Sequence, residues 1–218
     1  MHEKNISYSK LVGTLALVLA LPMVVFVALR RLELWPRATT KTPVSTVSQS
    51  TGTCATEMVT SLSAALASPA DVCVLDLMDQ KITDLPPQID TLVNLEEMHL
   101  GGTSMLKLPP EIGSLGKLRV LDLMDVPIET LPPELGNLRE LRNLDIDDTG
   151  LTSFPEVIVQ LKNLEVLNLA FVNVGHIPDS ISQLTHLKEL DVTGIVMTET
   201  DKIRLKNLLP NVTIIGLQ

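Results

Sequence analysis

The sequence predicts an α/β solenoid, a stack of similar short units with helical caps, joined to one N-terminal membrane-spanning helix. Three observations predict this architecture. An apolar pattern recurs at a fixed interval through most of the chain after residue 72, and an uncharged stretch of 19 residues runs from Leu11 to Leu29. Hydrophobic residues make up 45% of the chain but aromatic residues only 2%. The core must therefore be built from aliphatic side chains, as a stack of small units allows.

Each unit begins with two apolar residues separated by one position, and each pair starts 23 residues after the pair before it. The pairs are Leu75/Leu77, Met98/Leu100, Leu121/Leu123, Leu144/Ile146, Leu167/Leu169 and Leu190/Val192. The alternation predicts a short strand, and a proline at a fixed offset predicts the return turn. Because one unit cannot bury its own apolar edge, the units must stack. We expect a parallel sheet on the concave side and short helical or irregular segments on the convex side.

The pattern L-x-L-x-x-x-x-[IL]-x-x-L-P-x-x-[IL]-x-x-L-x-x-L resembles the 23-residue leucine-rich repeat of the typical or Ras-group-related class, common in bacterial repeat proteins. The resemblance covers residues 72–197 and implies a leucine-rich-repeat solenoid, a fold that serves many partners. One column departs from the family, which usually carries Asn there. Here the column reads Gln80, Thr103, Val126, Thr149, Val172 and Ile195. We expect the backbone or water to satisfy these turns instead.

The chain divides into six predicted segments. They are an N-terminal tail (1–10), a transmembrane helix (11–31), a Ser/Thr/Pro-rich stalk (32–53), an N-terminal capping helix (54–71), the repeats (72–197) and a C-terminal cap of helix and strand (198–218). The apolar run of residues 11–29 reaches roughly 28 Å as a helix, close to the hydrocarbon thickness of a bilayer. A cleaved signal peptide is the alternative, although no small-x-small site follows the run. Thr198 with Asp201 predicts a capping box at the last helix.

Two sets of features disagree on the side of the membrane that holds the repeats. Four Lys or Arg follow the apolar run and two precede it, which places the repeats in the cytoplasm by the positive-inside rule. The Ser/Thr/Pro composition of the stalk is typical of exported domains. Cys54 and Cys73 bracket one short helical segment and suit a disulfide, which needs an oxidising compartment; two unrelated buried thiols are the alternative. We favour an extracytoplasmic repeat domain.

The charge is distributed unevenly along the chain. Residues 1–41 hold six Lys or Arg against two Glu, whereas the remainder holds 11 against 24 Asp or Glu. An acidic repeat domain repels nucleic acid, so we expect no nucleic-acid partner. The sequence shows no catalytic constellation, phosphate loop or zinc-ligand spacing: Gly101-Gly102 lacks a Lys and a following helix, and the cysteines lack C-x-x-C spacing. We therefore expect a binding protein without cofactor or metal, not an enzyme.

The candidate site is the solvent side of the predicted concave sheet, where we expect side chains to point into water. Its residues are Asp76, Met78, Asp79, His99, Asp122, Met124, Asp125, Asp145, Asp147, Asp148, Asn168, Phe171 and Asp191. His99 is interpreted as a solvated surface histidine. The carboxylates with a few apolar neighbours suit a protein partner that has a basic segment. A face that merely keeps the protein soluble, and a divalent-cation site, remain open.

Two functions compete for such a surface. The first is a membrane-anchored protein-interaction module that binds a protein partner through its concave face. The second is a structural or adhesive surface protein without a single defined ligand. Both follow from an anchor, a stalk and an unbroken repeat array.

Overall fold

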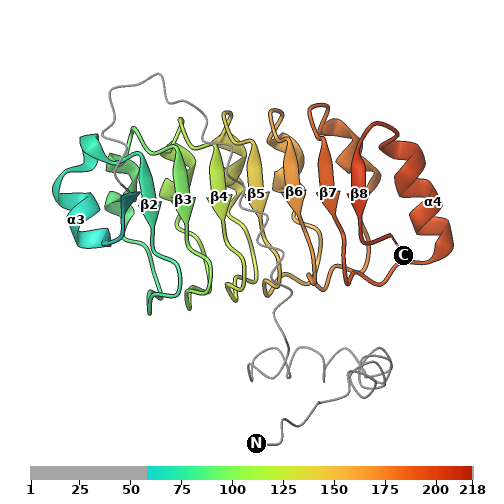
Figure 1. The fold of residues 1–218 in the computed structure, drawn as a ribbon, viewed down its shortest axis with the longest axis horizontal. Helices are drawn as coiled ribbons and strands as arrows, with labels where there is room; N and C mark the ends of the chain where they lie inside the picture. The colour runs from blue at the N-terminus through green and yellow to red at the C-terminus, as the bar shows by residue number, and fades with distance from the viewer. Residues whose placement is uncertain (1–57, 218) are drawn as a thin grey trace, which may run out of the picture. The chain divides into compact units, whose positions relative to one another are not determined.

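The computed structural model describes residues 58–217, which form one parallel sheet of eight strands in chain order (Figure 1). The strands are β1 (Met58–Val59), β2 (Val74–Asp76), β3 (Glu97–His99), β4 (Val120–Asp122), β5 (Asn143–Asp145), β6 (Val166–Asn168), β7 (Glu189–Asp191) and β8 (Thr213–Ile215). The predicted solenoid is confirmed for this part of the chain. The predicted tail, transmembrane helix and stalk lie outside the described residues.

The register of the sheet follows directly from the repeat. Leu75 lies opposite Met98, and Leu121 lies opposite Leu144, so equivalent residues of successive units are neighbours. Each side chain between two strand apolars therefore stands beside its counterparts in the adjacent units. A column of the sequence pattern thus becomes a row of side chains across the sheet.

The side opposite the sheet carries 3₁₀ segments. They are η2 (Pro69–Asp71), η3 (Pro87–Thr91), η4 (Pro110–Ser114), η5 (Pro133–Asn137), η6 (Glu156–Gln160) and η7 (Asp179–Gln183). A 3₁₀ helix has three residues per turn, so the apolar residues at every third position all face inward. Ile112 and Leu115 are examples, with 0% and 1% of their surface exposed. The predicted short helical or irregular convex side takes this form.

The turns after the strands are closed by the backbone, as expected from the missing Asn column. The amide of Val126 donates to the carbonyl of Leu123 at 3.2 Å, and Val172 repeats the bond with Leu169 at 3.2 Å. At Thr149 the hydroxyl also donates, to the carbonyl of Ile146 at 2.9 Å. Apolar residues are therefore tolerated in this column because the turn needs no side-chain amide.

The N-terminal cap differs from the single helix predicted over residues 54–71. Met58–Val59 forms β1, which pairs in parallel with β2, and helix α3 (Leu62–Ala67) begins only after Ser61. The Ser61 hydroxyl accepts a hydrogen bond from the amide of Ala64 at 3.4 Å. Pairing with the exposed edge of β2 satisfies backbone groups that a longer helix would leave open. Helical spacing of the apolar residues did not reveal this strand.

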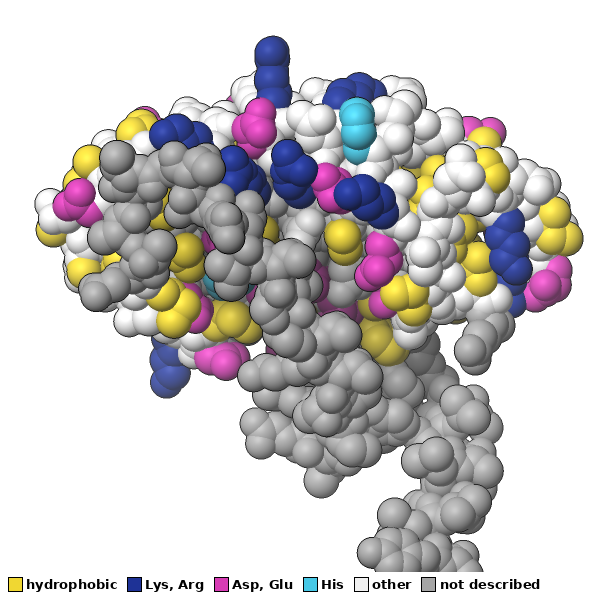
Figure 2. Space-filling view, turned by 45° about the horizontal axis from the view of Figure 1, so that its top comes forward, with side chains coloured by type: hydrophobic (Ala, Val, Ile, Leu, Met, Phe, Trp, Pro, Cys, Tyr) yellow, Lys and Arg dark blue, Asp and Glu magenta, His cyan; other side chains and the backbone are white. Residues whose placement is uncertain are grey.

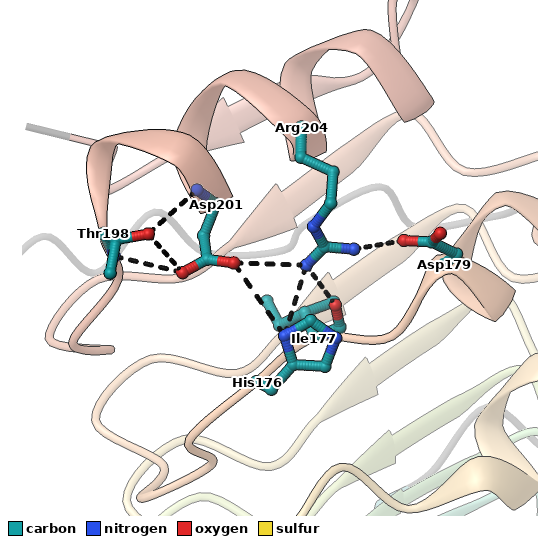
Figure 3. Close-up of polar contacts among 6 residues, drawn as sticks. All are labelled: His176, Ile177, Asp179, Thr198, Asp201 and Arg204. Atoms are coloured by element: carbon teal, nitrogen blue, oxygen red, sulfur yellow. Dashed lines mark hydrogen bonds and ion pairs between the residues drawn. The ribbon is translucent and has the colours of Figure 1, made fainter.

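The C-terminal cap consists of helix α4 (Glu199–Leu208) followed by β8. Both bonds of the predicted capping box between Thr198 and Asp201 are present. Arg204 ties the helix to the preceding turn, where it donates to the carbonyl of Ile177 at 2.7 Å and pairs with Asp179 (Figure 3). The cap is therefore held by its own polar contacts as well as by apolar packing.

The predicted disulfide and the predicted transmembrane helix both involve residues outside the described part of the chain. Cys73 is buried, with 5% of its surface exposed, and it is disulfide-bonded. Cys54, its predicted partner, lies outside the described residues. Among residues 58–217, no helix has the length and apolar character needed to cross a bilayer.

Candidate binding face on the concave sheet

The central row of the concave face comes from the residues between the paired strand apolars, and we call it the inner column. It comprises Asp76, His99, Asp122, Asp145, Asn168 and Asp191. The sheet register places His99 beside Asp122, and Asp122 beside Asp145. The predicted carboxylates of neighbouring strands are thus brought together as the repeat spacing implied.

Five of the six inner-column side chains are fixed by their own backbone. Each accepts a hydrogen bond from the amide two residues later. The donors are Met78 to Asp76 (3.0 Å), Met124 to Asp122 (2.9 Å), Asp147 to Asp145 (2.9 Å), Ala170 to Asn168 (2.9 Å) and Thr193 to Asp191 (2.8 Å). The four carboxylates among them are partly exposed, and each also has a fixed hydrogen-bond donor on its own backbone. Asn168 makes the same bond without a charge, so the bond requires an oxygen and not an anion.

His99 is the exception in the column, and its interpretation as a solvated histidine is wrong. Its Nε2 lies 3.5 Å from Glu97 Oε2 and its Nδ1 lies 3.6 Å from Asp122 Oδ2, with 25% of the side chain exposed. Hydrogen bonds to Asp122 and then Glu97 raise the pKa of His99 to about 9. The column therefore contains a cation at neutral pH. In the sequence, the position of His99 between Asp76 and Asp122 in the same column indicated that it would lie beside carboxylates.

Asp145 is the most perturbed carboxylate of the column. Burial raises its pKa to about 6, and the nearby charges of Asp122 and Asp191 act in the same direction. The Asp147 amide and the side-chain amide of Asn168, which donates at 3.1 Å, oppose the shift without cancelling it. Asp145 is therefore ionised at neutral pH, and its ionised form lowers the stability of the fold.

The next positions along each strand form the rim of the face. Met78 and Met124, the two methionines predicted for this face, are 36% and 37% exposed. Asp147, in contrast, is buried, with 9% of its surface exposed. An aspartate at this rim position therefore faces inward where the equivalent methionines face water.

The following residue of each turn has a left-handed backbone, and we call this row the turn column. It comprises Asp79, Gly102, Asp125, Asp148, Phe171 and Gly194, with φ between 53° and 79°. Asp and Gly adopt this conformation readily, so three of the predicted site carboxylates have a structural reason for their place. Phe171 does not adopt it readily. Its ring lies against Gly194, where an added Cβ would be 2.6 Å from the ring atom Cδ1.

The cations near the strand starts pair with other carboxylates and not with the inner column. Arg119 bonds Glu96 at 3.1 Å, while Arg142 and Lys188 both bond Glu165, at 2.7 and 2.6 Å. Figure 2 shows Lys and Arg side chains interspersed with Asp and Glu side chains on the face that it presents. Arg119 and Arg142 thus form ion pairs with Glu96 and Glu165.

A second ladder of side chains was missed by the sequence argument. Asn94 donates to the Ala70 carbonyl and Asn163 to the Arg139 carbonyl, both at 2.8 Å. His186 Nδ1 lies 2.8 Å from the carbonyl of Lys162 in the same position of its own unit. The signal in the sequence was a polar residue four positions before the first strand apolar residue of a unit. Across residues 58–217, no group of three or more His, Cys, Asp or Glu side chains is arranged to hold a metal ion.

Comparisons with known proteins agree with this geometry. Residues 110–210 match the family described as leucine-rich repeat region. No curated protein sequence matches the chain.

The solved structures that resemble it include the following three. A leucine-rich-repeat protein of Leptospira interrogans is 25% identical over 74% of this chain, with a TM-score of 0.41. The Toll–Spatzle complex of Drosophila is 24% identical over 58% of this chain, with a TM-score of 0.53. The plant peptide hormone receptor RGFR1 in complex with RGF2 is 28% identical over 67% of this chain, with a TM-score of 0.52.

The chain spans only part of each of these proteins, 58%, 17% and 24% of their respective lengths. The described residues of this chain form a stack of repeats with eight parallel strands and a 3₁₀ convex side. The described part of the chain therefore has a leucine-rich-repeat region whose repeats form one parallel sheet.

Proposed function

We propose that this protein is a membrane-anchored interaction module that binds a protein partner through the concave face of its repeats. The observation that carries the proposal is the fixed inner column, in which five side chains are bonded to their own backbone. A surface whose polar groups are already ordered loses little conformational freedom when a partner binds. The concave face is preorganised in this sense.

The chemistry of the face favours a partner with a cationic segment. Asp122, Asp145 and Asp191 lie in one row. The nearby Arg119 and Arg142 form ion pairs with glutamates outside that row. Met78 and Met124 beside the row provide apolar contact area. Charge complementarity of this kind supplies specificity and faster association. The likeness to a plant receptor described in complex with RGF2 supports the use of such a sheet for ligand binding.

The remaining parts of the proposal rest on the sequence. Residues 11–29 form the membrane span, the repeats belong to the 23-residue typical or Ras-group-related class, and the domain faces the extracytoplasmic side. Cys54 is the disulfide partner of Cys73, since the chain holds only two cysteines. Closing that loop of about 19 residues stabilises the first unit by on the order of 3 kcal/mol.

Affinity capture with two matched variants tests the binding face. In the first variant, Asp76, Asp122 and Asp191 are changed to Asn, which can accept the same backbone bonds. In the second, Asp90, Glu111 and Glu134 on the 3₁₀ segments are changed to the corresponding amides, which removes the same charge from the opposite side. We expect the first variant to lose a saturable partner and the second to retain it.

The outcome also separates the two functions. Added salt should weaken the wild-type complex, because exposed charges are screened within about 10 Å at 0.1 M. Equal loss in both variants would show that only net charge matters. Broad, weak and unsaturable binding by the wild-type chain would favour the structural or adhesive alternative.

A further inference from the structure

We propose that the inner column is a proton-responsive element in which Asp145 takes up a proton on mild acidification and thereby weakens the hold of the concave face on a cationic partner. The inference rests on the proposed binding function and concerns its regulation. It begins from a cluster of side chains in contact across neighbouring strands, from His99 on β3 to Asn168 on β6.

The geometry singles out Asp145 within that cluster. The groups facing it are Asp122 from β4, the neutral amide of Asn168 from β6 and, one strand further, the carboxylate of Asp191 on β7. Its own strand contributes the amide of Asp147 at 2.9 Å. The side chain is half-buried, and no cation appears among the groups that set its charge. A proton is the simplest means of relieving this crowding of carboxylates.

His99 keeps the other end of the cluster positively charged over the same pH range. It is flanked by Glu97 on its own strand and Asp122 on β4, while Asp76 occupies the paired position on β2. These contacts hold the pKa of His99 near 9, whereas that of Asp145 lies near 6. Between pH 7.5 and pH 5, Asp145 therefore changes charge and His99 does not. Acidification makes the row less negative at one defined place.

The chain contains an internal comparison for this proton. Asn168 occupies the same column and accepts the same backbone bond as Asp145, from Ala170 at 2.9 Å. An uncharged side chain is therefore compatible with this position of the column, and Asp145→Asn imitates the protonated carboxylate. Asp76→Asn is the matched control, because Asp76 also accepts a backbone bond but lies three strands away on β2.

The first arm of the test needs no partner and uses urea denaturation of the full chain at pH 4.5 and pH 7.5. A carboxyl with a raised pKa in the folded state destabilises the fold as pH rises from about 4 to about 6. Asp145→Asn should therefore have a higher urea midpoint than wild type at pH 7.5, and this difference should be much smaller at pH 4.5. The Asp76→Asn variant should follow the pH dependence of wild type. An unchanged difference between Asp145→Asn and wild type at the two pH values would overturn the proton assignment.

The second arm measures binding of tetramethylrhodamine-labelled decalysine to the same full-length proteins at low salt. The lysine side chains stay charged at both pH 5 and pH 7.5, so the charge of the peptide does not change between the two measurements. Wild type should bind roughly fivefold more weakly at pH 5, as expected for one lost charge near a cation. Asp145→Asn should bind with the weaker affinity at both pH values, and Asp76→Asn should keep the pH dependence.

The two arms separate the inference from the function on which it rests. Wild-type pH dependence retained by Asp145→Asn in the binding arm would overturn the regulatory role. Absence of decalysine binding by wild type at pH 7.5 would instead refute the cationic-partner function, and the regulatory role with it. In that case the urea arm alone would still decide whether Asp145 is the group that takes up the proton.

Discussion

At the scale of single residues, the turn column shows how a side chain of one repeat unit packs against the backbone of the next unit. Gly194 has φ of +79° and lies under the ring of Phe171. We expect Gly194→Ala to lower the free energy of unfolding by about 2 kcal/mol, because a Cβ adds left-handed strain and meets the ring. Gly175→Ala is the control, since nothing lies within 4 Å of a Cβ there. Urea denaturation of both variants measures the difference, and equal effects would contradict the packing role of Gly194.

His99 gives a second pH-dependent prediction of the same sign as that for Asp145, but at higher pH. Its pKa is raised from 6.5 to about 9 in the folded protein, so its stabilising contribution is complete below pH 6.5 and is lost as pH rises through 9. The loss should be about 1 kcal/mol after allowance for solvent screening. We expect His99→Asn to flatten the fall in urea midpoint between pH 7 and pH 9.5. In a separate NMR titration, Asp122→Asn should lower the pKa of the imidazole, and an unaltered imidazole titration would show that Asp122 is not its main partner.

At the scale of elements, Arg204 links helix α4 to the preceding turn. Arg204 reaches both the Ile177 carbonyl and Asp179 in the preceding turn (Figure 3). Arg204→Ala should cost about 1 kcal/mol and should raise hydrogen exchange several-fold in α4 and β8 while leaving β4 and β5 unchanged. Lys206→Ala, on the exposed side of the same helix, should do neither. Uniform exchange throughout the sheet in Arg204→Ala would mean that the cap and the repeats unfold together.

The elements also show what the sequence could and could not predict. The 23-residue spacing predicted the strands, their parallel register and the identity of the inner column, because a repeat converts sequence position directly into spatial position. It did not predict β1, since two residues that pair with an edge look like the start of a helix. It also did not predict the hydrogen bonds of Asp122 and Asp145, which arise from turn geometry that apolar periodicity does not encode. Carboxylates interpreted as solvated were thus partly structural.

At the scale of the whole molecule, each unit contacts only its neighbours, and the inner column is the polar counterpart of the stacked leucine core. Leu121 and Leu144 pack as neighbours inside the sheet while Asp122 and Asp145 stand side by side on its concave surface. Apolar burial stabilises the stack, and the row of like charges opposes it. A concave face of this composition costs stability, which is the expected pattern for a surface selected for binding.

The last prediction concerns the arrangement of the whole chain at a membrane. Because residues 11–29 are long and apolar enough to span a bilayer, we expect the chain to stay in the membrane fraction through alkaline carbonate washing. Arg37 and Lys41 in the stalk are trypsin sites, so trypsin added to intact cells should release the repeats if they face outward. A variant with both residues changed to Gln should resist this release. Release of uncut protein by carbonate would contradict the anchor, and cleavage only after cell lysis would place the repeats inside.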